Sequence, residues 1–223
     1  MTTITLRKIL TGSLIVSLLF LTGCATRKDA AFTDDTTNVD TSKESVAFFT
    51  LKISNKNNIA YQPYVHSLIV FEDKEKDNNR FSFAVEDPYK EVESQYNEYI
   101  VSFQVKPGKY ILTDLIARGG WFPIMGVFST PLSKSITIPD NKVIYLGHMD
   151  AKIIDKTKDD ELRAGPLLPL VDQAIIGAST GTFKIKITDR YDQDIKLVQK
   201  KYSYLNDLPV ENMTLSEWEQ PVR

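Results

Sequence analysis

Cysteine is almost absent from this sequence, since Cys24 is the single one among 223 residues. No disulfide can form within such a chain, so burial of apolar surface must stabilise the fold. A domain of about 175 residues can meet this demand, because chains of that size bury roughly 70% of the surface that they expose when unfolded.

The chain also has few histidines and no large excess of either charge. The chain has two histidines, 27 basic residues and 29 acidic residues. The chain therefore has no excess of positive charge that could compensate the negative charge of a phosphate backbone, and we expect no nucleic-acid partner. Ten Gly and ten Pro exclude collagen-like and low-complexity chains, and 21 Phe and Tyr with two Trp exclude wholesale disorder.

The apolar stretch near the N-terminus is too short to cross a bilayer. It runs from Ile9 to Leu21, 13 residues, which as a helix span about 20 Å against a hydrocarbon core of about 30 Å. Arg7 and Lys8 precede it and small residues follow it, an order typical of a secretory signal peptide. We expect residues 1–23 to be removed, which leaves 200 residues with a formal charge of −4.

The segment Leu21-Thr22-Gly23-Cys24 resembles the lipobox of bacterial lipoproteins. The resemblance implies cleavage before Cys24, a diacylglycerol on its sulfur, and a membrane partner held through that lipid, because two or three acyl chains anchor a protein essentially permanently. Ala25 stands where an Asp would favour retention in the inner membrane, which implies the outer membrane, facing the periplasm. The alternative is an ordinary secretory peptide with an incidental cysteine.

The next residues are mostly polar. Residues 25–45 are rich in Thr, Asp, Ser and Lys, and their large apolar side chains are Phe32 and Val39. We therefore expect residues 24–45 to be the lipidated Cys and a flexible linker, whose roughly 20 coil residues have an r.m.s. span of about 25 Å. A single domain should follow over residues 46–223.

From Val46 onward, apolar residues recur with a period of two. The clearest case has Phe183, Ile185 and Ile187 alternating with polar residues. Such alternation is typical of strands with one buried and one wet face, which belong to antiparallel sheets. Eight short strand-like runs predict a mainly β fold, an antiparallel β-sandwich of seven to eight strands, with a barrel as the main alternative.

One segment has the period of a helix instead. Between Asp192 and Leu205, the apolar residues Ile195, Val198 and Tyr202 recur at helical spacing. We expect one amphipathic helix over residues 192–205, lying on the sandwich, with Asp192 available as its cap.

The segment Lys106-Pro107-Gly108-Lys109 predicts a type II turn in a tight hairpin, because Pro presets the first corner and Gly accepts a positive φ at the second. Together with Val143–Gly147 it is similar to uncharacterised bacterial lipoproteins built on a transthyretin-like or carboxypeptidase-regulatory-like β-sandwich. The resemblance covers about 15 residues.

A possible nucleophile motif is present but lacks its context. Gly177–Gly181 matches the G-x-S-x-G pattern around Ser179. That pattern needs a helix after the Ser and a His later in the chain, whereas a strand-like run follows here and both His66 and His148 precede Ser179. We expect a flexible turn and no catalytic residue.

Metal-ligating residues are equally sparse. His148 and Asp150 lie two apart on one strand and share a face, but a site needs three or four ligands. Asp189, Asp192 and Asp194 lack the Gly and closing Glu of a calcium loop, so helix capping explains them better. We expect no metal and no cofactor.

Two apolar segments read as loops, residues 118–128 and residues 167–176. Either they fold back to close the sandwich, or they form an exposed patch that binds an envelope protein, a ligand or lipid. The candidate partner-binding residues are Trp121, Phe122, Ile124, Met125 and Phe128.

These patterns together predict a membrane-anchored envelope lipoprotein with a non-enzymatic structural or binding module. The alternative is an envelope hydrolase acting on wall or lipid material, whose paired carboxylates only the fold would bring together.

Overall fold

The computed structural model describes residues 26–74, 79–121, 123–166 and 174–221. This part of the chain holds eleven β-strands, one α-helix and one short 3₁₀ turn, so the prediction of a mainly β fold is confirmed. The elements are β1 (Thr26–Lys28), β2 (Ser45–Asn55), β3 (Tyr64–Glu72), β4 (Arg80–Ala84), β5 (Lys90–Val92), β6 (Tyr96–Val105), β7 (Gly108–Trp121), β8 (Ile124–Ile138), β9 (Val143–Asp155), β10 (Gly181–Thr188), α2 (Tyr191–Lys201), η2 (Ser203–Leu205) and β11 (Val210–Asn212).

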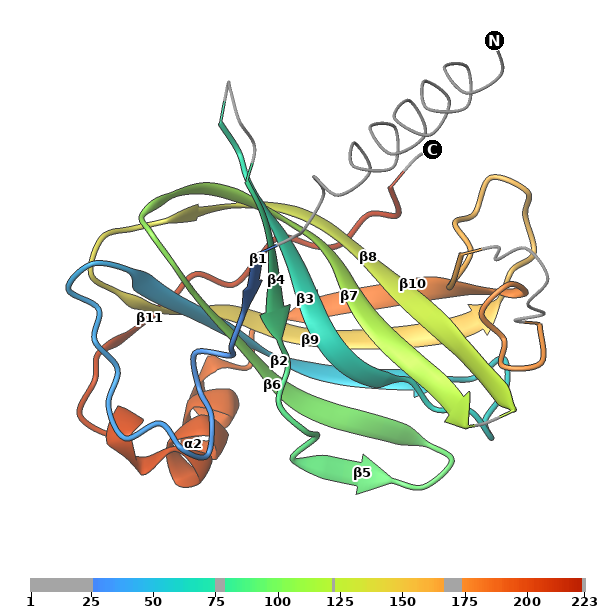
Figure 1. The fold of residues 1–223 in the computed structure, drawn as a ribbon, viewed down its shortest axis with the longest axis horizontal. Helices are drawn as coiled ribbons and strands as arrows, with labels where there is room; N and C mark the ends of the chain where they lie inside the picture. Colours follow the sequence, from blue (N-terminus) through green and yellow to red (C-terminus); the bar gives the residue numbers. More distant parts are fainter. Residues whose placement is uncertain (1–25, 75–78, 122, 167–173, 222–223) are drawn as a thin grey trace, which may run out of the picture.

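The strands form two sheets. Sheet A has the order β1-β4-β3-β7-β8, and sheet B has the order β10-β9-β2-β6-β5, with β11 also beside β9. In Figure 1 the strands of sheet A cross in front of those of sheet B. The inward side chains of both sheets form one apolar core, in which Phe83 of β4 stacks on Phe103 of β6 with ring centroids 5.5 Å apart.

Both sheets are mixed, so the prediction of purely antiparallel pairing is wrong. The pairs β1–β4, β2–β9 and β11–β9 are parallel. Strand β2 is buried on both of its faces, and Lys52 is its one residue outside the buried class. Burial on both faces is typical of parallel pairing, and a period-two pattern does not reveal the direction of a neighbouring strand.

The Pro-Gly turn at residues 106–109 is not a hairpin. It carries the chain from β6 in sheet B to β7 in sheet A, so the strands that it joins do not pair. The hydroxyl of the buried Tyr110 donates to the carbonyl oxygen of Lys106 at 2.8 Å, which fixes this corner. Burial raises the pKa of Tyr110 to about 12.

The apolar segment 118–128 is not a loop either. It continues the hairpin of β7 and β8, with Gly119 opposite Gly126 and Trp121 opposite Ile124. A Cβ on Gly119 would lie 2.4 Å from the ring of Phe128, so glycine is what allows that ring to enter the core.

The predicted flexible linker over residues 24–45 is wrong for residues 26–45. Residues 26–28 form β1, and the exposed fraction of the Phe32 side chain is 1%. The backbone N–H of Phe32 donates to the Oγ of Ser102 on β6 at 2.8 Å. The segment therefore crosses onto the outer face of sheet B, where a few apolar residues suffice to hold it.

Helix α2 covers the same outer face. Of the predicted apolar stripe, Val198, Tyr202 and Leu205 are buried and Ile195 is half-buried. The helix ends at Lys201, and Leu205 lies in η2. Residue Arg190, not Asp192, occupies the N-cap position. No helix in the described residues is long and apolar enough to cross a membrane. The second core between this layer and sheet B consists of Phe32, Val39, Val46, Phe48, Ile100, Val143, Tyr145, Val198, Tyr202 and Leu205.

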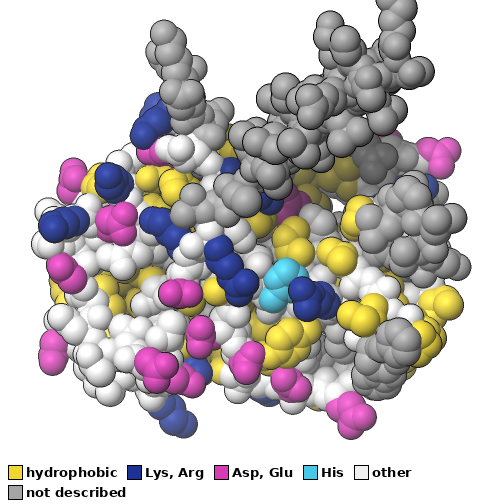
Figure 2. Space-filling view, in the orientation of Figure 1, with side chains coloured by type: hydrophobic (Ala, Val, Ile, Leu, Met, Phe, Trp, Pro, Cys, Tyr) yellow, Lys and Arg dark blue, Asp and Glu magenta, His cyan; other side chains and the backbone are white. Residues whose placement is uncertain are grey.

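The outer face of sheet A, which is in front in Figure 1, is not covered by a further layer of the described residues. Figure 2 shows hydrophobic side chains there, mixed with charged side chains of both signs. This mixture agrees with a sheet that has one wet face.

The C-terminal segment, residues 213–221, is part of the red trace in Figure 1 and lies between the edge strands β8 and β10. Leu215 and Trp218 pack against the main core, and the indole Nε1 of Trp218 donates to the carbonyl oxygen of Pro131 at 2.8 Å. Gln220 donates to the hydroxyl of Thr182 at 3.1 Å, so the segment joins the edges of the two sheets.

The packing of Phe32 gives a direct test of the third layer. We expect Phe32→Ala to lower the free energy of unfolding by about 3–5 kcal/mol, because it removes a buried aromatic ring. The exposed Thr37 lies in the same segment, and Thr37→Ala should change stability by less than about 0.5 kcal/mol. Urea denaturation measures both, and equal small effects would show that the segment is a spacer.

Candidate functional site

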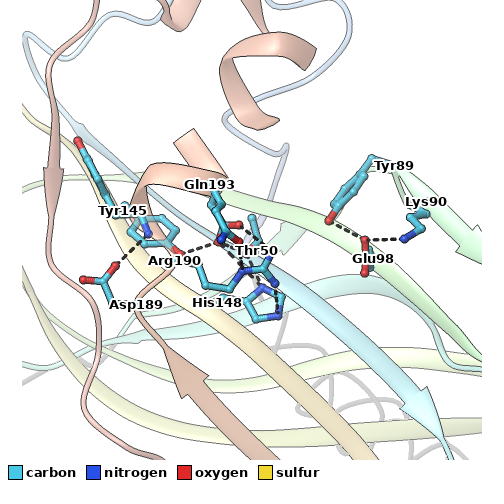
Figure 3. Close-up of polar contacts among 11 residues, drawn as sticks. Thr50, Tyr89, Lys90, Glu98, Tyr145, His148, Asp189, Arg190 and Gln193 are labelled. Carbon is cyan, nitrogen blue, oxygen red and sulfur yellow. Dashed lines mark hydrogen bonds and ion pairs between the residues drawn. The ribbon is translucent and has the colours of Figure 1, made fainter. Parts of the chain in front are cut away.

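A buried polar cluster lies between α2 and the outer face of sheet B (Figure 3). It consists of Thr50 on β2, Tyr145 and His148 on β9, Asp194 on α2, and Arg190 at the start of that helix. The exposed fractions of Thr50 and Asp194 are 1% and 2%. Polar groups this deeply buried must satisfy one another by hydrogen bonds.

A bulge in β9 brings two of these side chains to the same face. Tyr145 pairs with Phe48 and His148 pairs with Thr50, so two residues of β9 lie opposite one residue of β2. Gly147 lies in the bulge with φ of +109°, a conformation that L side chains rarely adopt. Because of the extra residue, Tyr145 and His148 both face α2 although they are three apart in sequence.

The hydrogen bonds of the cluster form one ordered chain. The Oδ2 of Asp194 accepts from the hydroxyl of Thr50 at 2.5 Å and from the hydroxyl of Tyr145 at 2.6 Å. Since Thr50 gives its proton to Asp194, its Oγ1 accepts from Nδ1–H of His148 at 2.8 Å. The Nε2 of His148 then carries no proton and accepts from Nη1 of Arg190 at 3.2 Å.

The charges of the cluster agree with this tautomer. Burial lowers the pKa of His148, and the nearby Arg190 lowers it further, against the opposing effect of Asp194. Burial and the hydrogen bond to Asp194 raise the pKa of Tyr145. The histidine and the tyrosine are therefore neutral at pH 7, and Asp194 forms its ion pair with Arg190, 3.8 Å from Oδ1 to Nη2.

A second polar group lies near the cluster, also drawn in Figure 3. Glu98 on β6 accepts from the hydroxyl of Tyr89 at 2.9 Å and lies 3.8 Å from the ammonium of Lys90. Burial, followed by the charge of Glu98, raises the pKa of Tyr89. This group fastens the segment before β5 to the sheet.

The direction of the proton chain is unlike that of a nucleophile and its base. A catalytic histidine accepts the proton of a hydroxyl, whereas here Thr50 accepts from His148 and donates to Asp194. The second ring nitrogen of His148 is occupied by Arg190. The arrangement is suited to fasten α2 to β2 and β9.

The residues predicted as a partner-binding patch do not all lie at the surface. Phe128 is fully buried in the main core, so its prediction as a surface residue is wrong. The exposed fraction of Met125 is 49%, and Ile124 is half-buried against the core. Phe122, the side chain of Trp121, and Cys24 lie outside the described residues.

The other sequence candidates are dispersed. Ser179 lies in the turn before β10, where its carbonyl oxygen accepts from Arg163 at 2.5 Å, while His66 lies on β3 in sheet A. Asp150 pairs with Lys152 at 2.9 Å and not with His148. Among the residues that the structure describes, no three of His, Cys, Asp and Glu lie close enough to hold a metal ion.

Sequence reasoning missed Asp194, Thr50 and Tyr145 as a cluster. Asp194 lies one turn before the buried Val198, so it is an acid within the apolar stripe of the helix. A charge in that position must find a buried partner, and this signal could have indicated the contact with the sheet.

Comparisons with known proteins identify no family. No family model and no curated protein matches the chain. Among solved structures, part of the chain is similar to a leucine-rich repeat protein from Bacteroides thetaiotaomicron VPI-5482, at 15% identity and a TM-score of 0.31. That match spans 49% of this chain and 14% of the other chain, and a likeness of this size supports no conclusion about fold or function.

Removal of Asp194 should uncouple α2 from sheet B. We expect Asp194→Ala to lower the free energy of unfolding by about 2–4 kcal/mol, because it leaves the buried hydroxyls of Thr50 and Tyr145 without their acceptor. The exposed Asp192 lies in the same turn, and Asp192→Ala should cost about 0.5 kcal/mol through the helix dipole. Urea denaturation of both variants checks this. Similar losses of stability in the two variants would contradict the role of Asp194 in fastening α2 to sheet B.

The pH dependence of stability should report the two histidines. Burial lowers the pKa of both His148 and His66 in the folded state below the ordinary value of 6.5. The unfolded chain then binds more protons, so stability should fall as pH decreases from about 7.5 to 5.5, by at most about 1.4 kcal/mol per unit for each histidine.

Replacement of His148 separates its contribution to this pH dependence from that of His66. We expect His148→Asn to be less stable at pH 7.5 but to lose less stability on acidification, measured as the melting temperature at each pH. An unchanged slope would mean that His148 has the same pKa in the folded and the unfolded chain, and would contradict the lowered pKa.

Proposed function

We propose that this chain is a membrane-anchored envelope lipoprotein, with a diacylglycerol on Cys24, and that its β domain is a non-enzymatic structural or binding module. The observation that carries the proposal is the segment Leu21-Thr22-Gly23-Cys24 directly after a short apolar stretch. We further propose an outer-membrane location facing the periplasm, because Ala25 follows the cysteine.

The start of the fold sharpens this proposal. Strand β1 begins at Thr26, two residues after Cys24. Two residues span at most about 7 Å, so a lipid on Cys24 would hold the domain directly at the membrane surface. The edge formed by β1 and β4 would then be nearest to the bilayer.

The buried cluster supports a non-enzymatic module. Its histidine and carboxylate side chains are 8% and 2% exposed, and its proton donors are used within the cluster. The alternative of an envelope hydrolase would need an accessible base beside a substrate cleft. His148 and Asp194 do not supply one.

We also propose that the two sheets form a sandwich of the transthyretin-like or carboxypeptidase-regulatory-like kind. The common core of both sheets and the corner fixed by Tyr110 support this. The parallel pairing of β2 with β9 must then be a variation on that plan.

Labelling with a fatty-acid analogue tests the anchor. We expect the wild-type protein to incorporate the label and to stay in the membrane fraction after a high-salt wash, because acyl chains bind independently of charge. Cys24→Ala should lose both properties.

A matched control keeps this result specific. Thr11→Ala changes the same signal segment outside the lipobox resemblance and should behave as wild type. Equal labelling of Cys24→Ala and the wild type would refute lipidation at Cys24.

A further inference from the structure

The outer face of sheet A is basic. Successive side chains of a strand point to opposite faces, so the residues that alternate with the buried ones point outward. The charged residues at these outward positions are Arg27 on β1, Arg80 on β4, and Lys109, Asp114 and Arg118 on β7. Four cations therefore share this face with one carboxylate, in a chain whose net charge is −2.

Contacts of the neighbouring residues agree with this direction. The ammonium of Lys28 lies 5.1 Å from the ring centroid of Phe81 and 5.7 Å from that of Phe83. Both rings pack in the main core, so Lys28 points inward and Arg27 beside it points outward. Arg118 is exposed and lies between two buried residues of β7.

The positive charge of this face is not neutralised within the described residues. None of the ion pairs there includes one of the four outward cations. The carboxylate of Asp114 accepts from the hydroxyl of Ser129 at 2.7 Å instead. Burial lowers the pKa of His66, and the charges of Arg118 and Arg27 lower it further, so both guanidinium groups lie near this outward ring.

Apolar side chains lie among these cations. Phe71 on β3 pairs with Ile111 on β7, and both are half-buried on the outer face. Residues 162–166 border the face at β8, where the backbone N–H of Ser129 donates to the carbonyl oxygen of Ala164 at 2.8 Å. Figure 2 shows hydrophobic side chains beside charged ones on this side of the molecule. Basic residues with apolar side chains between them are typical of a surface that lies on anionic lipid.

We propose that the outer face of sheet A lies on the membrane surface, with its four cations against the headgroup phosphates of anionic phospholipids. The inference rests on the proposed lipid at Cys24 and adds the orientation of the domain to it.

The position of the anchor favours a bilayer over a partner protein as the occupant of this face. Strand β1 begins two residues after Cys24, which span at most about 7 Å, and it is an edge strand of sheet A. The inner face of that sheet packs on sheet B, so the outer face is the one that the anchor can lay on lipid. Attraction to an anionic surface falls off within about 10 Å, and so short a tether keeps the cations within that distance.

Quenching of a fluorescent dye by lipid headgroups tests the orientation. The lipidated full protein is placed on vesicles of phosphatidylethanolamine with about one-fifth phosphatidylglycerol and with a nitroxide on some headgroups. One dye is attached through Thr137→Cys, an exposed outward position opposite Lys109, and another through Lys196→Cys on the exposed side of α2. Acylation blocks Cys24, so each variant carries one reactive thiol.

The two dyes should differ in quenching by roughly threefold or more. Helix α2 lies beyond both sheets, and packed sheets are about 10 Å apart, so the dye at Lys196 is more than about 10 Å further from the headgroups. Equal quenching of the two dyes, in protein that stays on the vesicles after a salt wash, would overturn the orientation and leave the anchoring intact. Absence of lipid on Cys24 would refute the proposed function, and this inference with it.

Charge variants test the role of the cations. Arg27→Glu with Arg118→Glu should lower quenching of the dye at Thr137 to the level seen at Lys196, because the face is then repelled by anionic headgroups. Lys184→Glu with Lys186→Glu makes the same charge change on the outer face of sheet B and should leave quenching as in the wild type.

The two pairs separate a specific face from net charge. Equal losses of quenching in both pairs would show that total charge alone holds the domain near lipid, and would overturn the proposal. Unchanged quenching in both pairs would also contradict it, since the four cations would then have no role.

Discussion

The pairing of β2 with β9 at the centre of sheet B is the constraint on which the rest of the structure depends. Strand β2 is buried almost throughout and β9 is buried over residues 143–149, so the outer face of this part of the sheet must be covered as well as the inner one. Residues 29–45 and α2 supply that cover. The polar side chains that the bulge in β9 turns outward, above all His148, then need partners, and Asp194 and Arg190 provide them.

The cover extends over only part of the outer face of sheet B. Near α2 the face is apolar and closed, with its polar groups satisfied internally. Toward β10 it carries the exposed Lys184 and Lys186, and the C-terminal segment joins that margin to β8. Under the proposed anchoring at Cys24, the strand that begins two residues later would hold sheet A next to the membrane.

The sequence predicted the strands well, because period-two alternation follows directly from the pleat of a strand with a buried face. It could not predict strand direction, so the parallel β2–β9 pair was missed. The Pro-Gly turn was correctly placed between strands, but local turn chemistry does not determine whether those strands pair. The burial of Phe32 could not be predicted because its neighbours in sequence are polar. The role of Asp194 could not be predicted because its partner Thr50 lies on β2, far away in sequence.

The central claim is that residues 26–45 form a structural layer and not a spacer. Trypsin treatment of the native full-length protein, followed by mass spectrometry, tests it most directly, because Arg27, Lys28 and Lys43 lie in this segment. If the layer is packed as described, cleavage at all three sites should proceed no faster than unfolding of the domain. Rapid removal of the residues before Glu44, with the β domain left intact, would contradict the account.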